Sequence, residues 1–361
     1  MTKQPKTRKI KASERLDDVA SNGDLALSAS TPPPPPPETS TDGEILKTTA
    51  TLPDWLDKYI YDELGAKFAP DHERYENNLD LNKEEVLIYL GTYFPRSYAE
   101  AFCISNSLLE NETIKNAMSS KGELNLLSVG CGAGGELIGM LTAIAKHLSN
   151  VETINIWAFD GNDKALKIAR LLIDKYTDLP INRSKICASI IHREFDSFKE
   201  SDLNEFKIGK IKFDLIVSSK MIVELIAQGS VKAYYDFVKT FLPLLSPNGI
   251  CALIDVTIKH EKLNKFNPEI MNNQISKALR ELNEFQTILP SLCRENKDNC
   301  NICRFVSYKF SVSHSRKNND QSKIAYRVIA RKKLAQESAL TLQTEVLTAN
   351  DCPSIIERDI L

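Results

Sequence analysis

The chain has 361 residues, of which 42% are hydrophobic and 26% are charged, and it contains eight cysteines. This composition is that of a globular protein and excludes a coiled coil, a collagen and a wholly disordered chain. Eight irregularly spaced cysteines do not suit a disulfide framework, so we expect a reducing compartment. The formal net charge of −2 excludes a uniformly basic nucleic-acid-binding protein but not local basic patches.

The first fifty residues are predicted to form a disordered, proline-rich tail. They are polar, and the run from Pro32 to Pro37 favours an extended polyproline II conformation. Residues 1–15 carry a net charge of +5, which is typical of a solvated tail or of an arm that binds a partner. No apolar run approaches the roughly 18 residues of a membrane span. We therefore expect a cytoplasmic protein with no membrane partner, with a mitochondrial location as the alternative.

A helical preface, or cap, is predicted over residues 51–120. Apolar residues follow helical spacing from Trp55 to Leu64 and again from Val86 to Leu90. A further helix is predicted from Ser97 to Leu109, after Pro95.

From Leu124 onwards, short apolar runs alternate with amphipathic segments. The predicted strands are 124–129, 153–159, 186–192, 213–218 and 250–258, and the predicted helices are 136–148, 163–176 and 231–245. This order predicts an α/β fold with a doubly wound, mostly parallel sheet covered on both faces.

The end of the domain has a different pattern. Residues 306–314 and 324–330 alternate polar and apolar side chains around a polar loop at 316–322, which predicts a terminal antiparallel hairpin. We place the domain at 121–333 and expect an acidic tail at 334–361.

The strongest motif is a glycine-rich turn between a predicted buried strand and a helix, Leu-Ser-Val-Gly-Cys-Gly-Ala-Gly-Gly-Glu at residues 127–136. Glycine permits unusual backbone angles and close approach of a ligand. Gly130, Gly132 and Gly135 satisfy the dinucleotide pattern G-x-G-x-x-G. Gly130, Gly132 and Gly134 instead give G-x-G-x-G, the pattern of class I methyltransferases that use S-adenosylmethionine (SAM).

The flanking residues favour the second pattern. Residues 159–166, Phe-Asp-Gly-Asn-Asp-Lys-Ala-Leu, resemble the class I methyltransferase version of the second strand end, and the terminal hairpin is a further trait of that family. The resemblance covers residues 124–332 and implies a Rossmann-like methyltransferase fold. It also implies that SAM is contacted by Gly130, Gly132, Gly134, Asp160, Asn162, Asp196 and Ser219.

One residue departs from the family pattern. The family usually has an acid two residues before the first glycine, where this chain has Ser128. The departure keeps open a non-catalytic assembly or binding protein with the same fold. An NAD(P)-dependent oxidoreductase is a more distant alternative. No catalytic residue is demanded by the fold, because the cofactor itself carries the reactive methyl group.

The segment after the fourth predicted strand bears on the methyl acceptor. Residues 218–221, Ser-Ser-Lys-Met, lack the motifs of base-amine and pyrimidine C5 methyltransferases. Residues 219–225 are similar to a phrase in the mitochondrial-type small-ribosomal-subunit methyltransferase family. That resemblance implies that Lys220 and Glu224 face the acceptor; the alternative is that Glu224 simply begins a helix.

Two further features concern metals and partners. Cys293, Cys300 and Cys303 form a C-x6-C-x2-C cluster that can hold zinc or an iron–sulfur cluster. Free loop thiols are the alternative, because a fourth ligand, for which His314 and Cys251 are candidates, is not identified. Residues 304–333 carry nine Lys/Arg and one acid. These charges favour RNA or a ribonucleoprotein as acceptor, whereas a small-molecule acceptor shaped by the preface and a merely solvated sheet edge are the alternatives.

Overall fold

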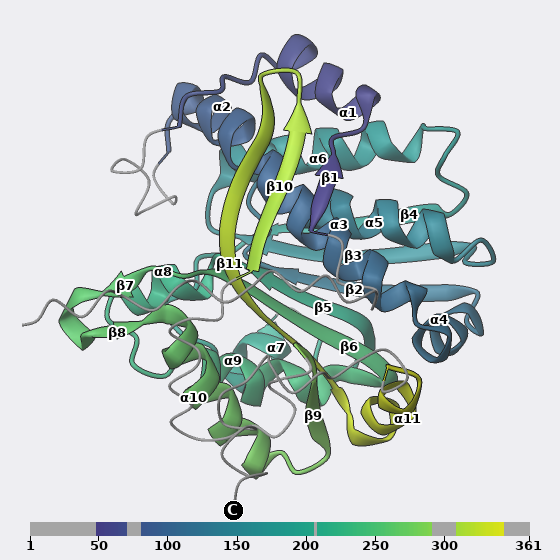
Figure 1. The fold of residues 1–361 in the computed structure, drawn as a ribbon, viewed down its shortest axis with the longest axis vertical. Coiled ribbons are helices and arrows are strands. Elements are labelled where there is room, and N and C mark those ends of the chain that lie inside the picture. Colours follow the sequence, from purple (N-terminus) through teal and green to yellow (C-terminus); the bar gives the residue numbers. More distant parts are fainter. Residues whose placement is uncertain (1–47, 71–80, 206–207, 291–307, 343–361) are drawn as a thin grey trace, which may run out of the picture. The chain divides into compact units, whose positions relative to one another are not determined.

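A computed structural model describes residues 48–70, 81–205, 208–290 and 308–342. In this part of the chain one mixed sheet of nine strands forms the centre, in the order β1-β10-β11-β6-β5-β2-β3-β4, with β9 also pairing with β11 (Figure 1). Its strands are β1 (Thr49–Thr51), β2 (Glu123–Val129), β3 (Thr153–Asp160), β4 (Lys185–His192), β5 (Phe213–Ser219), β6 (Leu245–Val256), β9 (Phe285–Leu289), β10 (Tyr308–His314) and β11 (Lys317–Arg331). A separate small sheet pairs β7 (Lys259–His260) with β8 (Lys265–Phe266).

The predicted α/β architecture is confirmed. Strands β4, β3, β2, β5 and β6 are parallel neighbours, whereas β11 runs antiparallel to β6, β9 and β10. All seven residues of β5 are buried, as expected for a parallel strand covered on both faces.

Helices cover both faces of the sheet (Figure 1). They are α1 (Asp54–Lys58), α2 (Lys83–Thr92), α3 (Phe94–Glu110), α4 (Glu112–Ser119), α5 (Gly135–His147), α6 (Asp163–Thr177), α7 (Glu200–Glu205), α8 (Ile222–Ala227), α9 (Ala233–Phe241), α10 (Asn267–Glu281) and α11 (Lys332–Leu342), with the π-helical turn η1 (Tyr59–Glu63) and the 3-10 turns η2 (Leu242–Leu244) and η3 (Glu261–Leu263). Consecutive residues of β2 face two different cores. Leu126 packs in the core that contains α3, α5 and α6, and Leu127 in the core that contains α8, α9 and α10.

The helical preface packs directly on the sheet domain. The Asn82 side chain accepts from the backbone N–H of Glu84 and Glu85, and this capping box begins α2. Helix α3 lies so close to α5 that a Cβ at Gly139 would be 2.5 Å from the carbonyl oxygen of Tyr98. Strand β1 pairs in parallel with β10. Preface and sheet therefore share one core.

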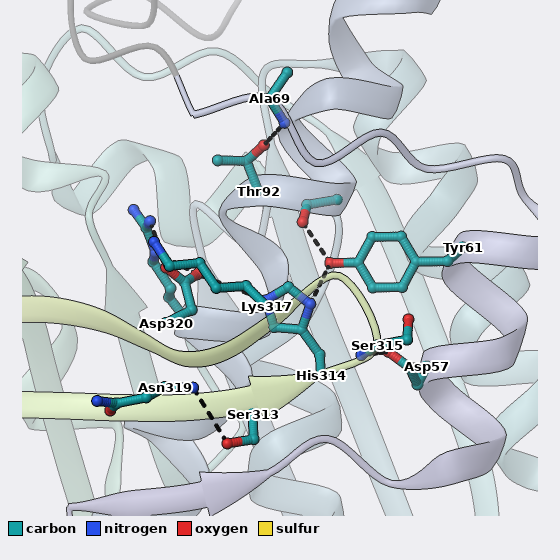
Figure 2. Close-up of polar contacts among 12 residues, drawn as sticks. Asp57, Tyr61, Ala69, Thr92, Ser313, His314, Ser315, Lys317, Asn319 and Asp320 are labelled. Atoms are coloured by element: carbon teal, nitrogen blue, oxygen red, sulfur yellow. Dashed lines mark hydrogen bonds and ion pairs between the residues drawn. The ribbon is translucent and has the colours of Figure 1, made fainter.

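The hairpin differs from its prediction in the position of the turn. The predicted loop 316–322 lies almost wholly within β11, whose residues from Lys317 onwards pair with β10. This polar segment can form a strand because its acid, Asp320, is buried in a bidentate ion pair with Arg96 of α3. Both contacts measure 2.8 Å. Figure 2 shows how the N-terminal helices hold the hairpin tip: Tyr61 Oη lies 3.0 Å from His314 Nδ1.

Other boundaries also differ. The helix predicted over 231–245 ends at Phe241, and β6 begins at Leu245, five residues before the strand predicted over 250–258. The expected C-terminal tail begins with α11, in which Leu334 is buried. The rest of that tail, at 343–361, and the basic N-terminal arm lie outside the described residues. Among the helices that the structure describes, none is long and apolar enough to cross a bilayer.

Candidate functional site

The glycine-rich turn lies at the carboxyl end of β2, where parallel sheets bind ligands. Gly130 and Gly132 have positive φ angles of 79° and 50°, which L-residues with a Cβ rarely adopt. A Cβ at Gly130 would also lie 2.3 Å from the Cβ of Met221. The backbone N–H groups of Gly130 and Cys131 donate to the carbonyl of Phe159, at 2.8 and 3.0 Å. These bonds hold the turn against the end of β3, and Gly134 is the N-cap of α5.

Asp160 is the last residue of β3 and connects two loops. Its carboxylate accepts from the backbone N–H of Gly132 at 2.7 Å and from that of Asn162 at 2.8 Å. Desolvation raises the pKa of Asp160, while both N–H donors lower it. A carboxylate has about four lone-pair positions, so two remain for a ligand's hydroxyl groups.

Three other predicted cofactor residues differ in their surroundings. The side-chain oxygen of Asn162 caps α6, accepting from the backbone N–H of Lys164 and Ala165. Asp196 is exposed in the loop after β4. The hydroxyl of Ser219 is buried at the end of β5 and has no hydrogen-bond partner in the described parts of the chain. Their contacts with a cofactor stay predictions.

A carboxylate lies beside the position where the family acid is missing. The Ser128 hydroxyl donates to Glu136 Oε1 at 2.9 Å, and Glu136 is only 3% exposed. Burial raises the pKa of Glu136 to about 8, despite hydrogen bonds from its own backbone N–H and from Ser128. The sequence analysis missed Glu136. Its signal is an acid in the first turn of α5, directly after the glycines.

Lys220, which was predicted to face the acceptor, makes polar contacts with α3, and its role towards an acceptor stays a prediction. Its Nζ lies 2.7 Å from Glu100 Oε2 on α3 and donates to Ser97 Oγ at 3.2 Å. Its φ of 63° is in the left-handed region, directly after β5. Through this ion pair and hydrogen bond, Lys220 connects the end of β5 to helix α3 of the preface.

Tyr89 of α2 covers the glycine-rich turn and was also missed. Its hydroxyl would lie 3.0 Å from a Cβ at Gly132. Desolvation, followed by the charges of Asp160, Glu224 and Glu136, holds the pKa of Tyr89 well above its usual value. The phenol is therefore a hydrogen-bond donor at neutral pH. Glu224, predicted to face the acceptor, is half-buried and lies within electrostatic range of this hydroxyl.

The predicted metal ligands Cys293, Cys300 and Cys303 lie outside the described residues. Of the two fourth-ligand candidates, Cys251 is fully buried in β6 and His314 is hydrogen-bonded to Tyr61. The described ranges contain no group of three or more side chains arranged to hold a metal ion.

The comparisons with known proteins agree with this geometry. Residues 91–249 match the family model of the CheR methyltransferase SAM-binding domain. No curated protein sequence matches the chain.

Solved structures with similarity to the chain include three methyltransferases. A TehB-like SAM-dependent methyltransferase from Corynebacterium glutamicum is 12% identical, covering 61% of this chain and 85% of its own, with a TM-score of 0.32. A putative class I enzyme from Listeria monocytogenes is 11% identical, covering 71% and 70%, with a TM-score of 0.38. The plantazolicin methyltransferase BamL, in complex with a triazolic desmethylPZN analogue and SAH, is 12% identical, covering 82% and 90%, with a TM-score of 0.36. Similarities this distant carry no argument about function. The functional assignment therefore rests on the family match and on the site.

Residues 91–249 of the chain therefore have the SAM-binding domain of a methyltransferase. The family match spans α3, the glycine-rich turn and the strands on either side of it. The residues present also fit the cofactor. The turn leaves no room for a Cβ at Gly130, and the buried hydroxyl of Ser219 has no hydrogen-bond partner within the described residues. The narrower resemblance of residues 219–225 to the ribosomal family stays a prediction.

Proposed function

We propose that the enzyme transfers the methyl group of SAM to a small-molecule acceptor that enters between the strand ends and α2. The observation that carries this proposal is the position of Tyr89 over Gly132. A glycine-rich turn covered by a helix of the preface suits a small acceptor better than a folded macromolecule.

The charge around the site supports the same choice. Carboxyl groups lie around Tyr89 at the strand ends, namely Asp160, Glu136 and Glu224, whereas the positive charge of Lys220 is paired with Glu100. Glu136, whose pKa is raised to about 8, is mostly protonated at pH 7, so the negative charge comes from the other carboxylates. These attract the positively charged sulfonium of SAM and disfavour the phosphates of a nucleic acid.

Individual residues then have separate tasks. SAM would supply a methyl group on a sulfonium centre and leave as the neutral thioether S-adenosylhomocysteine, so the protein contributes mainly alignment and electrostatics. Asp160 would accept from the ribose hydroxyls, and Asp196 would lie at the adenine. Tyr89, which stays protonated, would donate a hydrogen bond to the acceptor rather than remove its proton. Glu224 is the neighbouring carboxylate that could take up a proton after transfer.

RNA or a ribonucleoprotein is the second candidate acceptor. Lys309 and Lys323 are exposed and lie directly opposite each other on β10 and β11, so they present positive charge on one face. The arginines of the hairpin are less available, because Arg316 pairs with Asp62, Arg331 with Glu284, and Arg327 is buried.

The proposal is tested by methyl labelling. The full chain would be incubated with methyl-labelled SAM and a cell extract, and the products separated into RNA, protein and small molecules. We expect label in the small-molecule fraction, and none with an Asp160→Ala variant. Label that depends on the enzyme and enters only RNA or protein would contradict a small-molecule acceptor.

A further inference from the structure

The Ser128–Glu136 pair lies beside the glycine-rich turn at which SAM is expected to bind. Ser128 is the second residue before Gly130, and its hydroxyl is committed to Glu136 at 2.9 Å. Glu136 is in the first turn of α5 and is buried. A carboxyl group buried at such a position is costly unless it serves structure or a ligand. Within the described residues its side chain is hydrogen-bonded to the neutral hydroxyl of Ser128, which leaves the carboxyl group suited to a cation.

The orientation of the cofactor indicates which cation. If Asp160 at the end of β3 takes the ribose and Asp196 after β4 lies at the adenine, the adenosine lies over β3 and β4. The amino-acid end of SAM then extends across β2 towards β5. Glu136 lies on this path, because its carboxyl oxygen accepts from Ser128, the residue before the last one of β2. The amino-acid end carries an ammonium group.

We propose that Glu136, oriented by Ser128, is the carboxylate that receives the ammonium group of the methionine portion of SAM. In this chain the acid is therefore supplied by the helix that follows the glycines, and not by the strand that precedes them. This inference rests on the proposed function, since it assumes that SAM binds at the glycine-rich turn.

The assignment has a consequence for protons. The groups facing Glu136 are Asp160 from β3, Lys220 from β5, Tyr89 from α2 and Cys131 from the turn. With a pKa of about 8, free Glu136 is mostly protonated at pH 7. A bound ammonium favours the ionised form, so SAM binding at pH 7 releases a proton, and SAM affinity rises as pH increases towards 8. Above about pH 9 the free carboxyl is already ionised and the release disappears.

Calorimetric titration of the full chain tests the assignment with three ligands. SAM and S-adenosylhomocysteine both carry the ammonium group, whereas 5′-methylthioadenosine lacks the amino-acid portion. For Glu136→Gln we expect SAM and S-adenosylhomocysteine to bind about tenfold to a hundredfold more weakly, with 5′-methylthioadenosine binding unchanged. Titrations of the wild type in two buffers of different ionisation enthalpy should show proton release at pH 7, and Glu136→Gln should not.

A second variant separates charge from folding. The double variant Ser128→Asp/Glu136→Gln carries the carboxylate on β2 at position 128 and none at position 136. Its affinity for SAM should recover. Wild-type SAM affinity in Glu136→Gln, an equal loss for all three ligands, or no recovery in the double variant would overturn the assignment. A wild-type protein that binds none of the three ligands would instead contradict the proposed function itself.

Discussion

The ammonium of Lys220 lies 2.7 Å from the carboxylate of Glu100, and this ion pair joins the end of β5 to α3. Glu100 is completely buried, whereas the Lys220 side chain is 20% exposed. The contact links the preface to the strand end beside the glycine-rich turn, so the preface is part of the site's framework.

Removing the cation from this pair should destabilise the protein. Lys220→Met leaves the Glu100 carboxylate buried without its counter-charge, and we expect a loss of about 3 kcal/mol in the free energy of unfolding. Urea denaturation of both proteins measures the change. Lys309→Met, which removes an exposed lysine from β10, is the matched control and should change stability little. Equal effects of the two substitutions on the free energy of unfolding would contradict a stabilising role of the Lys220–Glu100 ion pair.

Asp320 should make stability depend on acid pH. His314, whose Nε2 lies 3.7 Å from the carboxylate, and the bidentate pair with Arg96 hold the pKa of Asp320 well below its usual value, overcoming desolvation. A carboxyl with a lowered folded-state pKa stabilises the fold above its unfolded pKa of about 4, and that contribution is lost as pH falls below it. The stability difference between wild type and Asp320→Asn should therefore shrink from pH 5 to pH 2.

The matched control for this prediction is Asp62→Asn. Asp62 pairs with Arg316 on the surface, with both side chains about half exposed. Its effect should be small throughout the titration, because exposed ion pairs contribute little. A pH-independent difference for Asp320→Asn would contradict the account.

Tyr89→Phe should slow methyl transfer without unfolding the protein. The substitution keeps the ring that packs against the turn and removes only the hydroxyl over Gly132. At saturating SAM we expect a decrease of about tenfold in the transfer rate, the effect of one lost hydrogen bond. Tyr235→Phe is the control, because it removes an exposed hydroxyl of α9 that donates to Glu281 of α10, and it should leave the rate unchanged.

Local sequence predicted the centre of the fold well. The segment from β2 to α6 lies within one or two residues of its prediction, because buried parallel strands are almost continuously apolar and the glycines between them meet backbone requirements. The hairpin turn was misplaced because residues 316–322 are polar. Only the contact of Asp320 with Arg96, more than two hundred residues earlier, explains why they form a strand.

The site was predicted less completely, for a related reason. Gly130, Gly132 and Asp160 are local features of strand ends, and the structure brings them together. Tyr89 and Glu100 reach the same place only through packing of the preface, so no spacing rule connects them with the turn. The ion pair of Lys220 likewise depends on a partner that its own neighbourhood in the sequence does not reveal.

The most direct test of the account is calorimetric titration of SAM into the full chain and into Asp160→Ala. We predict saturable one-to-one binding to the wild type and a loss of about tenfold to a hundredfold in affinity for the variant, because a charge-assisted contact to the ribose and the link to Gly132 are both removed. Undiminished SAM affinity in a folded Asp160→Ala protein, or no binding to the wild type, would contradict it.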